Sequence, residues 1–314
     1  MRQAYTYRPN GKNRIRETGE ASKRIVLSLN TALCAVYCLS LMLPLIWMLY
    51  SAFKTNLEYQ QDIMAFPKSL LYFENFSVVF EKLRIIRVTT VGGVPARVTY
   101  GLGNMLVTSF YFALAVSVIN VFFNTVFGYI LSKYKFRGRG FLYGLGIFIM
   151  VVPIIGTEAA YFRLIQQLGV YDNMVLTVLS APSVAFSGTY FLLMYAAFKG
   201  LAWEYAEAAF IDGAGHYKVF LRIMLPMAMP SMICLVTLNF IGMWNDYSAF
   251  LFYLPSYANL SYGLYIFEQN AAQYGVNPPV IYAGFVIAAV PVVGIYSVAQ
   301  KFILQKFTVG GLKG

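Results

Sequence analysis

Six apolar runs, each of about 20 residues or more, dominate the chain and limit the folds it can adopt. A helix rises about 1.5 Å per residue, so a run of this length covers the roughly 30 Å apolar thickness of a bilayer. The composition agrees, because 59% of the residues are hydrophobic and only 12% are charged. We therefore predict an all-α polytopic membrane protein with six transmembrane helices. The predicted spans are residues 25–53, 104–131, 141–160, 174–198, 227–252 and 280–304.

The basic residues indicate how the chain is oriented in the membrane. The net charge is +11, but the lysines and arginines fall in short clusters between apolar runs, not on one face as a nucleic-acid surface would require. Such clusters lie in the tail 1–24 and in the loop 132–139, which we place in the cytoplasm together with both termini. No short apolar core with a cleavage site precedes Ile25, so the first span is expected to be uncleaved.

This orientation divides the chain into functional segments. No window between residues 54 and 103 is apolar enough to span, so we expect an external segment that folds over or beside the membrane domain. A second external loop, 254–279, is rich in Tyr, Asn and Gln. Pro182 and Gly188 are expected to kink the fourth span. The predicted segments are the cytoplasmic tail 1–24, the first span 25–53, the external segment 54–103, a five-helix core 104–304 that includes the cytoplasmic loop 199–226, and the tail 305–314.

The loop 199–226 is much longer than a turn between two spans needs to be. Its polar part, EYAEAAFIDGAGHYKVFLRIMLP, begins at Glu204 and predicts a helical segment, a break at Asp212-Gly213 and a second helical segment that ends at Pro226. Gly213 permits a positive φ, so the chain can reverse there without strain. This organisation indicates a docking element offered to a partner on one side of the membrane.

Small and acidic side chains mark the first helical segment of this loop. Ala206, Ala208 and Ala209 would let a partner's groove approach the helix backbone closely. Glu204 and Glu207 lie three residues apart, on one helix face, where they can meet basic groups.

The order of residues in the loop resembles a known motif. Glu207-Ala208-Ala209 is followed after three residues by Gly213 and, about a dozen residues later, by Leu225-Pro226. This order is similar to the EAA loop of binding-protein-dependent ABC importers, in its sugar-importer version. The segment Arg84 to Tyr100 is longer than this family usually carries, and we assign it no role.

The resemblance implies a fold and a set of partners. It implies the type I ABC importer permease fold, in a bacterial or archaeal cytoplasmic membrane. It also implies a second, homologous permease subunit, two ABC ATPase subunits that grip the loops, and an extracytoplasmic solute-binding protein that delivers an oligosaccharide or related sugar. Membrane lipid surrounds the spans, and no nucleic acid is involved. ATP and Mg would be bound by the ATPases, so that this chain binds no cofactor itself.

Polar residues in the fifth apolar run are candidates for the solute path. Asn239, Gly242 and Asp246 are spaced to share one helix face. Trp244-Asn245-Asp246-Tyr247 resembles the WNDF segment of sugar-importer permeases. These side chains either line the path or join two subunits, and the sequence favours neither. Glu158, near the third span, either touches solute at the outer mouth or is an interfacial carboxylate.

Catalytic and metal-binding motifs are not found in the sequence. There is no GxxxxGK[ST] phosphate loop, no HExxH and no GxSxG, and the single histidine, His216, lies in the loop 199–226. The three cysteines, at 34, 38 and 234, lie in apolar runs and are expected to be small apolar fillers. We therefore expect a non-catalytic subunit. The alternatives are the same architecture importing a non-sugar solute, an ion-coupled secondary carrier, which the few ionisable residues in the spans disfavour, and a membrane sensor or scaffold.

Overall fold

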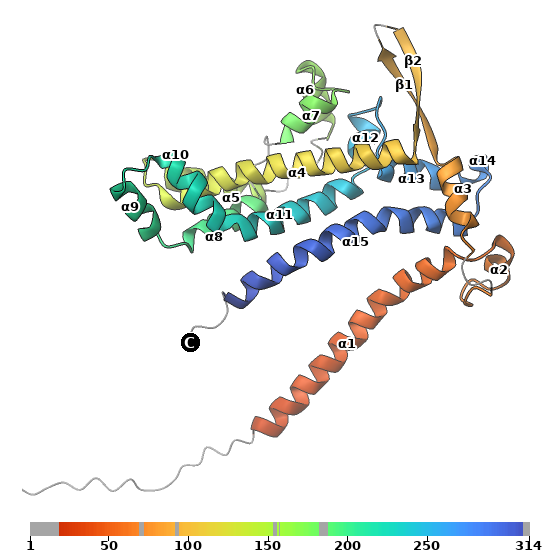
Figure 1. Ribbon diagram of the computed structural model, residues 1–314, viewed down its shortest axis with the longest axis horizontal. Coiled ribbons are helices and arrows are strands. Elements are labelled where there is room, and N and C mark those ends of the chain that lie inside the picture. The colour runs from red at the N-terminus through yellow and green to blue at the C-terminus, as the bar shows by residue number, and fades with distance from the viewer. Residues whose placement is uncertain are drawn as a thin grey trace, which may run out of the picture.

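The computed structural model describes residues 19–68, 72–91, 94–152, 156, 158–181 and 188–309. Long helices run side by side, with short helices at both ends of the bundle and one β-hairpin that projects from it (Figure 1). The elements are α1 Gly19–Ser51, α2 Asn56–Gln61, α3 Glu74–Lys82, β1 Arg84–Val91, β2 Val94–Gly101, α4 Leu102–Lys133, α5 Arg139–Val151, α6 Glu158–Gln167, α7 Met174–Leu179, α8 Thr189–Lys199, α9 Glu204–Ile211, α10 His216–Val219, the π-helix η2 Phe220–Met224, α11 Leu225–Asn245, α12 Ser248–Phe252, α13 Leu260–Gln269, α14 Ala271–Tyr274 and α15 Pro278–Val309.

Four helices in the described part of the chain are long and apolar enough to cross a bilayer. They are Arg24–Ser51, Leu102–Lys133, His216–Asn245 and Pro278–Lys301. The shortest has 24 residues and is therefore about 36 Å long, which exceeds the roughly 30 Å of hydrocarbon. These helices confirm the first, second, fifth and sixth predicted spans as helices of membrane-spanning length.

The third and fourth predicted spans are not continuous helices in the described residues. The third is divided between α5 and α6, and the fourth between α7 and α8. Pro153, which itself lies outside the described residues, has no N–H and disfavours helical geometry at the residue before it. Val152 accordingly has a ψ of 109°, and Gly188 has a φ of 98° directly before α8. The described backbone therefore leaves helical geometry at Val152 and at Gly188, whereas the kink predicted at Pro182 lies outside the described residues.

The fold is mostly helical, as predicted, and the external segment adds one β-hairpin that the sequence analysis did not predict. β1 and β2 pair antiparallel in continuous register from Arg84 opposite Gly101 to Val91 opposite Val94. β-Branched residues such as Ile86 and Val88 favour the extended backbone, which explains why this polar stretch forms strands.

Buried Lys54 helps to fix the external segment to the end of α1. Its ammonium Nζ donates to the carbonyls of Asp62 and Ile63, at 3.1 and 2.7 Å, and only 1% of the residue is exposed. Burial lowers the pKa of Lys54 below its ordinary value of 10.5, and the charges of Asp62 and Glu58 oppose that shift.

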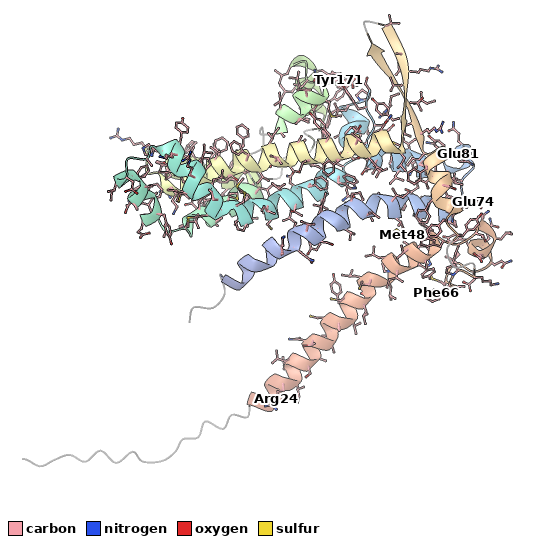
Figure 2. All side chains as sticks on the ribbon, in the orientation of Figure 1. Arg24, Met48, Phe66, Glu74, Glu81 and Tyr171 are labelled. Atoms are coloured by element: carbon pink, nitrogen blue, oxygen red, sulfur yellow. The ribbon has the colours of Figure 1, made fainter. Side chains whose placement is uncertain are left out.

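Helix α1 diverges from the rest of the bundle. Met48 lies at the end near Phe66 and Glu74, whereas Arg24 marks an end that stands well apart from the other helices (Figure 2). Every side chain from Arg24 to Ile46 is exposed. Such an apolar surface requires lipid or another subunit to cover it.

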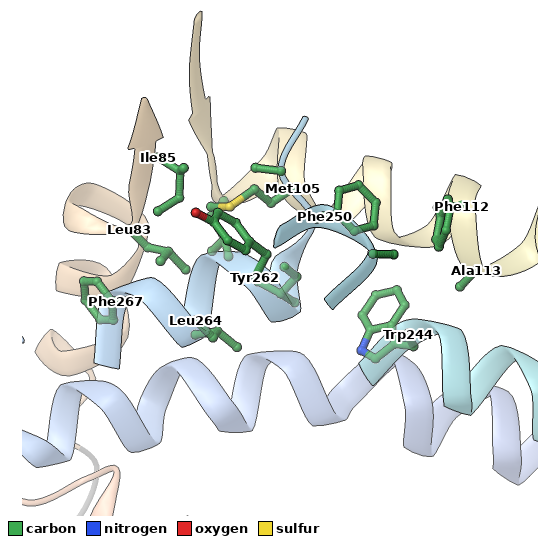
Figure 3. Packing of buried hydrophobic residues seen from close by; sticks show 14 of the residues in the cluster. Leu83, Ile85, Met105, Phe112, Ala113, Trp244, Phe250, Tyr262, Leu264 and Phe267 are labelled. Atoms are coloured by element: carbon green, nitrogen blue, oxygen red, sulfur yellow. The ribbon is translucent and has the colours of Figure 1, made fainter. Parts of the chain in front are cut away.

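Two apolar clusters hold the bundle together, one at each end. The hairpin-end cluster joins β1, α4, α11, α12, α13 and α15, and Figure 3 shows Trp244, Phe250 and Tyr262 packed toward Met105 and Phe112 of α4. The loop-end cluster joins the other halves of α4 and α11 to α8, α9, α10 and η2.

Buried polar side chains lie between the two clusters. On α4 the hairpin-end cluster extends to Val116 and the loop-end cluster begins at Val121. The side chains that we call the polar layer lie at this boundary on α4 and α11, except for Asn124, which lies one helical turn beyond it on α4. They are Ser117, Asn120, Asn124, Thr237 and Asn239.

Candidate coupling loop and solute path

The loop 199–226 contains two helices, α9 and α10, joined at a glycine. Gly213 has a φ of 80°, and its N–H donates to the Phe210 carbonyl at 3.0 Å. No atom lies within 4 Å of the position that a Cβ would take on Gly213. The glycine is therefore needed for the backbone conformation and not for close packing. The predicted helix, break and helix are present.

The second helical segment does not end at Pro226, contrary to the prediction. α10 continues through η2 into α11, so that His216–Asn245 forms one helix of 30 residues. Pro226 lies in the first turn of α11. The π-helix widens the backbone just before the proline, which gives the ring room beside the carbonyl of Arg222 four residues earlier. The loop and the fifth span are therefore mechanically continuous.

The alanines of α9 have different environments. Ala206 is fully buried in the loop-end cluster with Val219 and Met224, so its small size serves internal packing and not the approach of a partner, contrary to our expectation. Ala208 is exposed and Ala209 is half-buried. Of the other predicted docking residues, Leu225 is half-buried, and the exposed ones are Glu204, Glu207, Asp212, Gly213 and Pro226.

Exposed apolar side chains accompany the acidic ones, and we did not predict them from the sequence. Ile211 and Tyr217 are each 86% exposed, at the end of α9 and in α10. Tyr205 and Leu221 are also more than half exposed. The loop therefore presents acidic groups and protruding apolar groups together, a combination typical of protein interfaces.

A cluster of rings, which we call the aromatic brace, holds the loop against the end of α4; it consists of Tyr134, Trp203, Phe210 and His216. The Tyr134 hydroxyl lies 3.0 Å from Nδ1 of His216, and the His216 ring lies 4.9 Å from the ring of Phe210. Trp203 packs against Tyr134, and Lys133 Nζ donates to a carbonyl of the loop, that of Leu201. These contacts keep α9 and α10 in a fixed position relative to α4.

The polar layer opens on a cavity of about 910 Å³ that is lined by residues of α4, α6, α7, α8, α11 and α12. Asn239 lies on its wall, where its Oδ1 accepts a 3.0 Å hydrogen bond from Ser117. Asn120 and Asn124 line the cavity from α4. The remaining polar and aromatic lining consists of Tyr161, Thr177, Ser180, Thr189, Tyr190 and Tyr253.

One acceptor in this cavity has no partner. Asn124 is 1% exposed, and its amide nitrogen donates to the carbonyl and to Oδ1 of Asn120. Its own Oδ1 is buried and accepts no hydrogen bond from the described residues. A buried unpaired acceptor is costly, by roughly 1–3 kcal/mol, and a hydroxyl donor entering the cavity would satisfy it. The signal that could have revealed this pair is two asparagines four residues apart in an apolar run.

Three other predicted path residues, Trp244, Asn245 and Asp246, are not part of the described lining of this cavity. Trp244 is buried and donates from Nε1 to the Ala288 carbonyl of α15, and Asn245 is exposed and donates to the Ile241 carbonyl. α11 ends at Asn245, so Asp246 does not continue the face of Asn239.

The carboxylate of Asp246 has a local structural task. Its Oδ1 accepts from the backbone N–H of Ser248 at 2.8 Å and of Ala249 at 3.3 Å, and so caps the first turn of α12. Glu158 begins α6, but its side chain lies outside the described residues, so its role stays a prediction. In the described part of the chain, no three His, Cys, Asp or Glu side chains are grouped to hold a metal ion.

The fold and these sites define a multi-pass helical membrane protein. A family model described as the binding-protein-dependent transport system inner membrane component matches residues 124–309, more than half of the 314 residues. The chain belongs to this family. It is therefore the membrane component of a transport system and not an enzyme, as the sequence indicated.

Relatives in the same family are named for oligosaccharide transport. Diacetylchitobiose uptake system permease protein NgcG of Streptomyces coelicolor is 25% identical, over 92% of this chain and 90% of that protein. Arabinooligosaccharides transport system permease protein AraQ of Halalkalibacterium halodurans is 28% identical, over 86% and 91%. The trehalose/maltose permease protein MalG of Thermococcus litoralis is 28% identical, over 94% and 99%.

A solved structure supports the fold. The crystal structure of a bacterial ABC transporter involved in the import of the acidic polysaccharide alginate includes a chain that matches with a TM-score of 0.65. That match is 21% identical and covers 89% of this chain and 97% of the other.

Proposed function

We propose that this chain is the permease subunit of an ATP-driven importer for a neutral oligosaccharide or related sugar. The observation that carries this proposal is the cavity beside the polar layer. Its described lining offers asparagine amides, hydroxyls and three tyrosines, and it contains no Asp, Glu, Lys or Arg. Sugars are bound by flat aromatic faces and by hydrogen-bonding groups for their hydroxyls. The names of the relatives support the same class of solute.

The coupling to ATP hydrolysis is assigned to the loop 199–226. In this proposal, exposed Glu204 and Glu207 meet basic groups of an ATPase subunit, while Ile211 and Tyr217 enter an apolar groove on it. The continuous helix from His216 then carries the movement to Asn239, 23 residues and about 35 Å away along the helix axis. The aromatic brace transmits the same movement to α4, another of the helices that line the cavity. ATP binding would in this way change the side of the membrane to which the cavity opens.

The orientation and the partners follow from this assignment. The loop and both termini lie in the cytoplasm, and the hairpin and the residues 254–277 lie outside. A homologous second permease subunit completes the path, and an extracytoplasmic binding protein delivers the solute. ATP and Mg are held by the ATPase subunits. The uncharged lining of the cavity argues against an ion-coupled carrier, which needs titratable or ion-binding groups in its spans.

Charge reversal at Glu207 tests the coupling. We expect Glu207→Lys to lower ATP-dependent sugar uptake in reconstituted vesicles at least tenfold, since a docking interface depends on charge complementarity. The permease subunits should still co-purify with each other. Glu81→Lys is the matched control, because Glu81 is an exposed carboxylate on α3, at the opposite end of the bundle. Unchanged uptake by Glu207→Lys, or equal losses in the two variants, would refute the docking role.

A further inference from the structure

The β-hairpin is fixed to the bundle by one of its faces. Nη2 of Arg87 donates to the Phe250 carbonyl at 3.0 Å, and the Arg87 guanidinium carbon lies 4.1 Å from the ring centre of Tyr262. The hydroxyl of Tyr100, on the same face, donates to the Ser256 carbonyl at 3.1 Å. The hairpin is therefore a rigid projection and not a loose insertion.

The side chains on the opposite face of the hairpin are exposed. Ile86 and Val88 are 64% and 62% exposed, and they pair across the ladder with Thr99 and Arg97. Directly opposed residues of an antiparallel ladder lie on the same face, and Arg84, two residues before Ile86, lies there too. We call these five residues the outer hairpin face. No acidic residue occurs between positions 83 and 101.

The outer hairpin face is turned away from the membrane-spanning helices. Its inner counterpart rests on residues 250–262, which cap the hairpin end of the bundle, opposite the end that carries α9 and α10 (Figure 1). Since the proposed orientation puts α9 and α10 in the cytoplasm, this face looks into the external solution. Lipid tails and membrane spans of another subunit cannot cover it there, so it is accessible to a soluble partner.

We propose that the outer hairpin face docks a carboxylate-rich patch on the soluble binding protein that delivers the solute. This inference rests on the proposed function. Arg84 and Arg97 would attract and orient the acidic patch during approach, because complementary charges raise association rates. Ile86 lies between the levels of the two arginines and Val88 lies directly opposite Arg97, so both would supply the apolar contact beside the charges.

The test uses the complete transporter in lipid nanodiscs and the binding protein that supports sugar uptake by the wild-type complex. The charge variant is Arg84→Glu/Arg97→Glu, and its control is Lys68→Glu, a charge reversal at an exposed external site outside the hairpin. Binding of the sugar-loaded binding protein is measured at low and at high salt. We expect the association rate of the charge variant to fall about tenfold at low salt and to approach that of the wild type at high salt, where charges are screened.

A second variant tests the apolar part without changing charge. Ile86→Ser/Val88→Ser should leave the association rate near the wild-type value and speed dissociation several-fold. If both variants bind like the Lys68→Glu control, the hairpin is not the docking surface. The proposal is also overturned if the variants fail to assemble with the sister subunit, because the face would then belong to that contact. A wild-type complex that shows no uptake with any sugar-binding protein refutes the proposed function itself, which is a distinguishable result.

Discussion

The contact between α4 and α8 can be tested by replacing Gly128 with alanine. Gly128 is buried in α4, and a Cβ on it would lie 2.8 Å from the backbone nitrogen of Tyr195 and 3.0 Å from the carbonyl carbon of Met194 in α8. Ordinary contacts of a Cβ begin near 3.4 Å, so the two helices would have to separate by about 0.6 Å. Backbone atoms of a packed helix cannot rotate aside as the end of a side chain can.

The expected loss of stability follows from this overlap. Overpacking of a close contact costs roughly 1–3 kcal/mol, whereas replacing glycine by alanine without a clash gains approximately 1 kcal/mol in a helix. We expect the unfolding temperature of the purified Gly128→Ala transporter to lie about 2–6 °C below that of the Gly144→Ala transporter, measured by fluorescence in detergent. Gly144→Ala in α5 is the matched control, because no other described residue has an atom within 4 Å of its Cβ position. A Gly128→Ala transporter as stable as the Gly144→Ala transporter would refute the close contact.

Three further predictions concern single side chains. Asn124→Leu removes the unpaired acceptor and should lower sugar uptake about tenfold, whereas Thr125→Val on the same helix should not lower it. Equal uptake by the two variants would show that the cavity is not the solute path. Asp246→Asn should keep both the wild-type unfolding temperature and the wild-type uptake, because an amide oxygen can still accept from Ser248. Asp246→Ala, in contrast, should lose about 1 kcal/mol of stability. A large uptake defect in Asp246→Asn would show that Asp246 belongs to the solute path after all. The pKa of Lys54 is lowered by burial, so just below pH 10.5 the unfolded chain binds more protons and stability rises with pH. The unfolding temperature should therefore increase more between about pH 8 and pH 10 in the wild type than in Lys54→Met, and equal increases would contradict this.

The sequence predicted the features that depend on neighbouring residues. Apolar runs correctly predicted α1, α4, α11 and α15, because in these helices one continuous apolar run forms one continuous helix. The Asp212-Gly213 pair predicted the break between α9 and α10, since only glycine adopts φ of 80° there without strain. The hairpin was missed although its signals were local, two β-branched runs separated by Gly92-Gly93.

Other features depend on contacts between distant residues and could not be predicted. Tyr134 and His216 are 82 residues apart, and Ser117 and Asn239 are 122 residues apart. The helical spacing that placed Asp246 on the face of Asn239 also failed, because periodicity does not show where a helix ends. The cavity could be anticipated only in part for the same reason, since residues of six separate helices line it.

The polar layer has a consequence for how solute would move through the bundle. Hydrocarbon surfaces that are pulled apart lose their contacts, but an amide or hydroxyl can exchange one hydrogen-bonding partner for another at little net cost. At this level, the hydroxyl groups of a passing molecule can substitute for the bond between Ser117 and Asn239. The hairpin-end and loop-end clusters would then move relative to each other most easily when solute occupies the cavity, so that bound solute itself lowers the barrier to the conformational change.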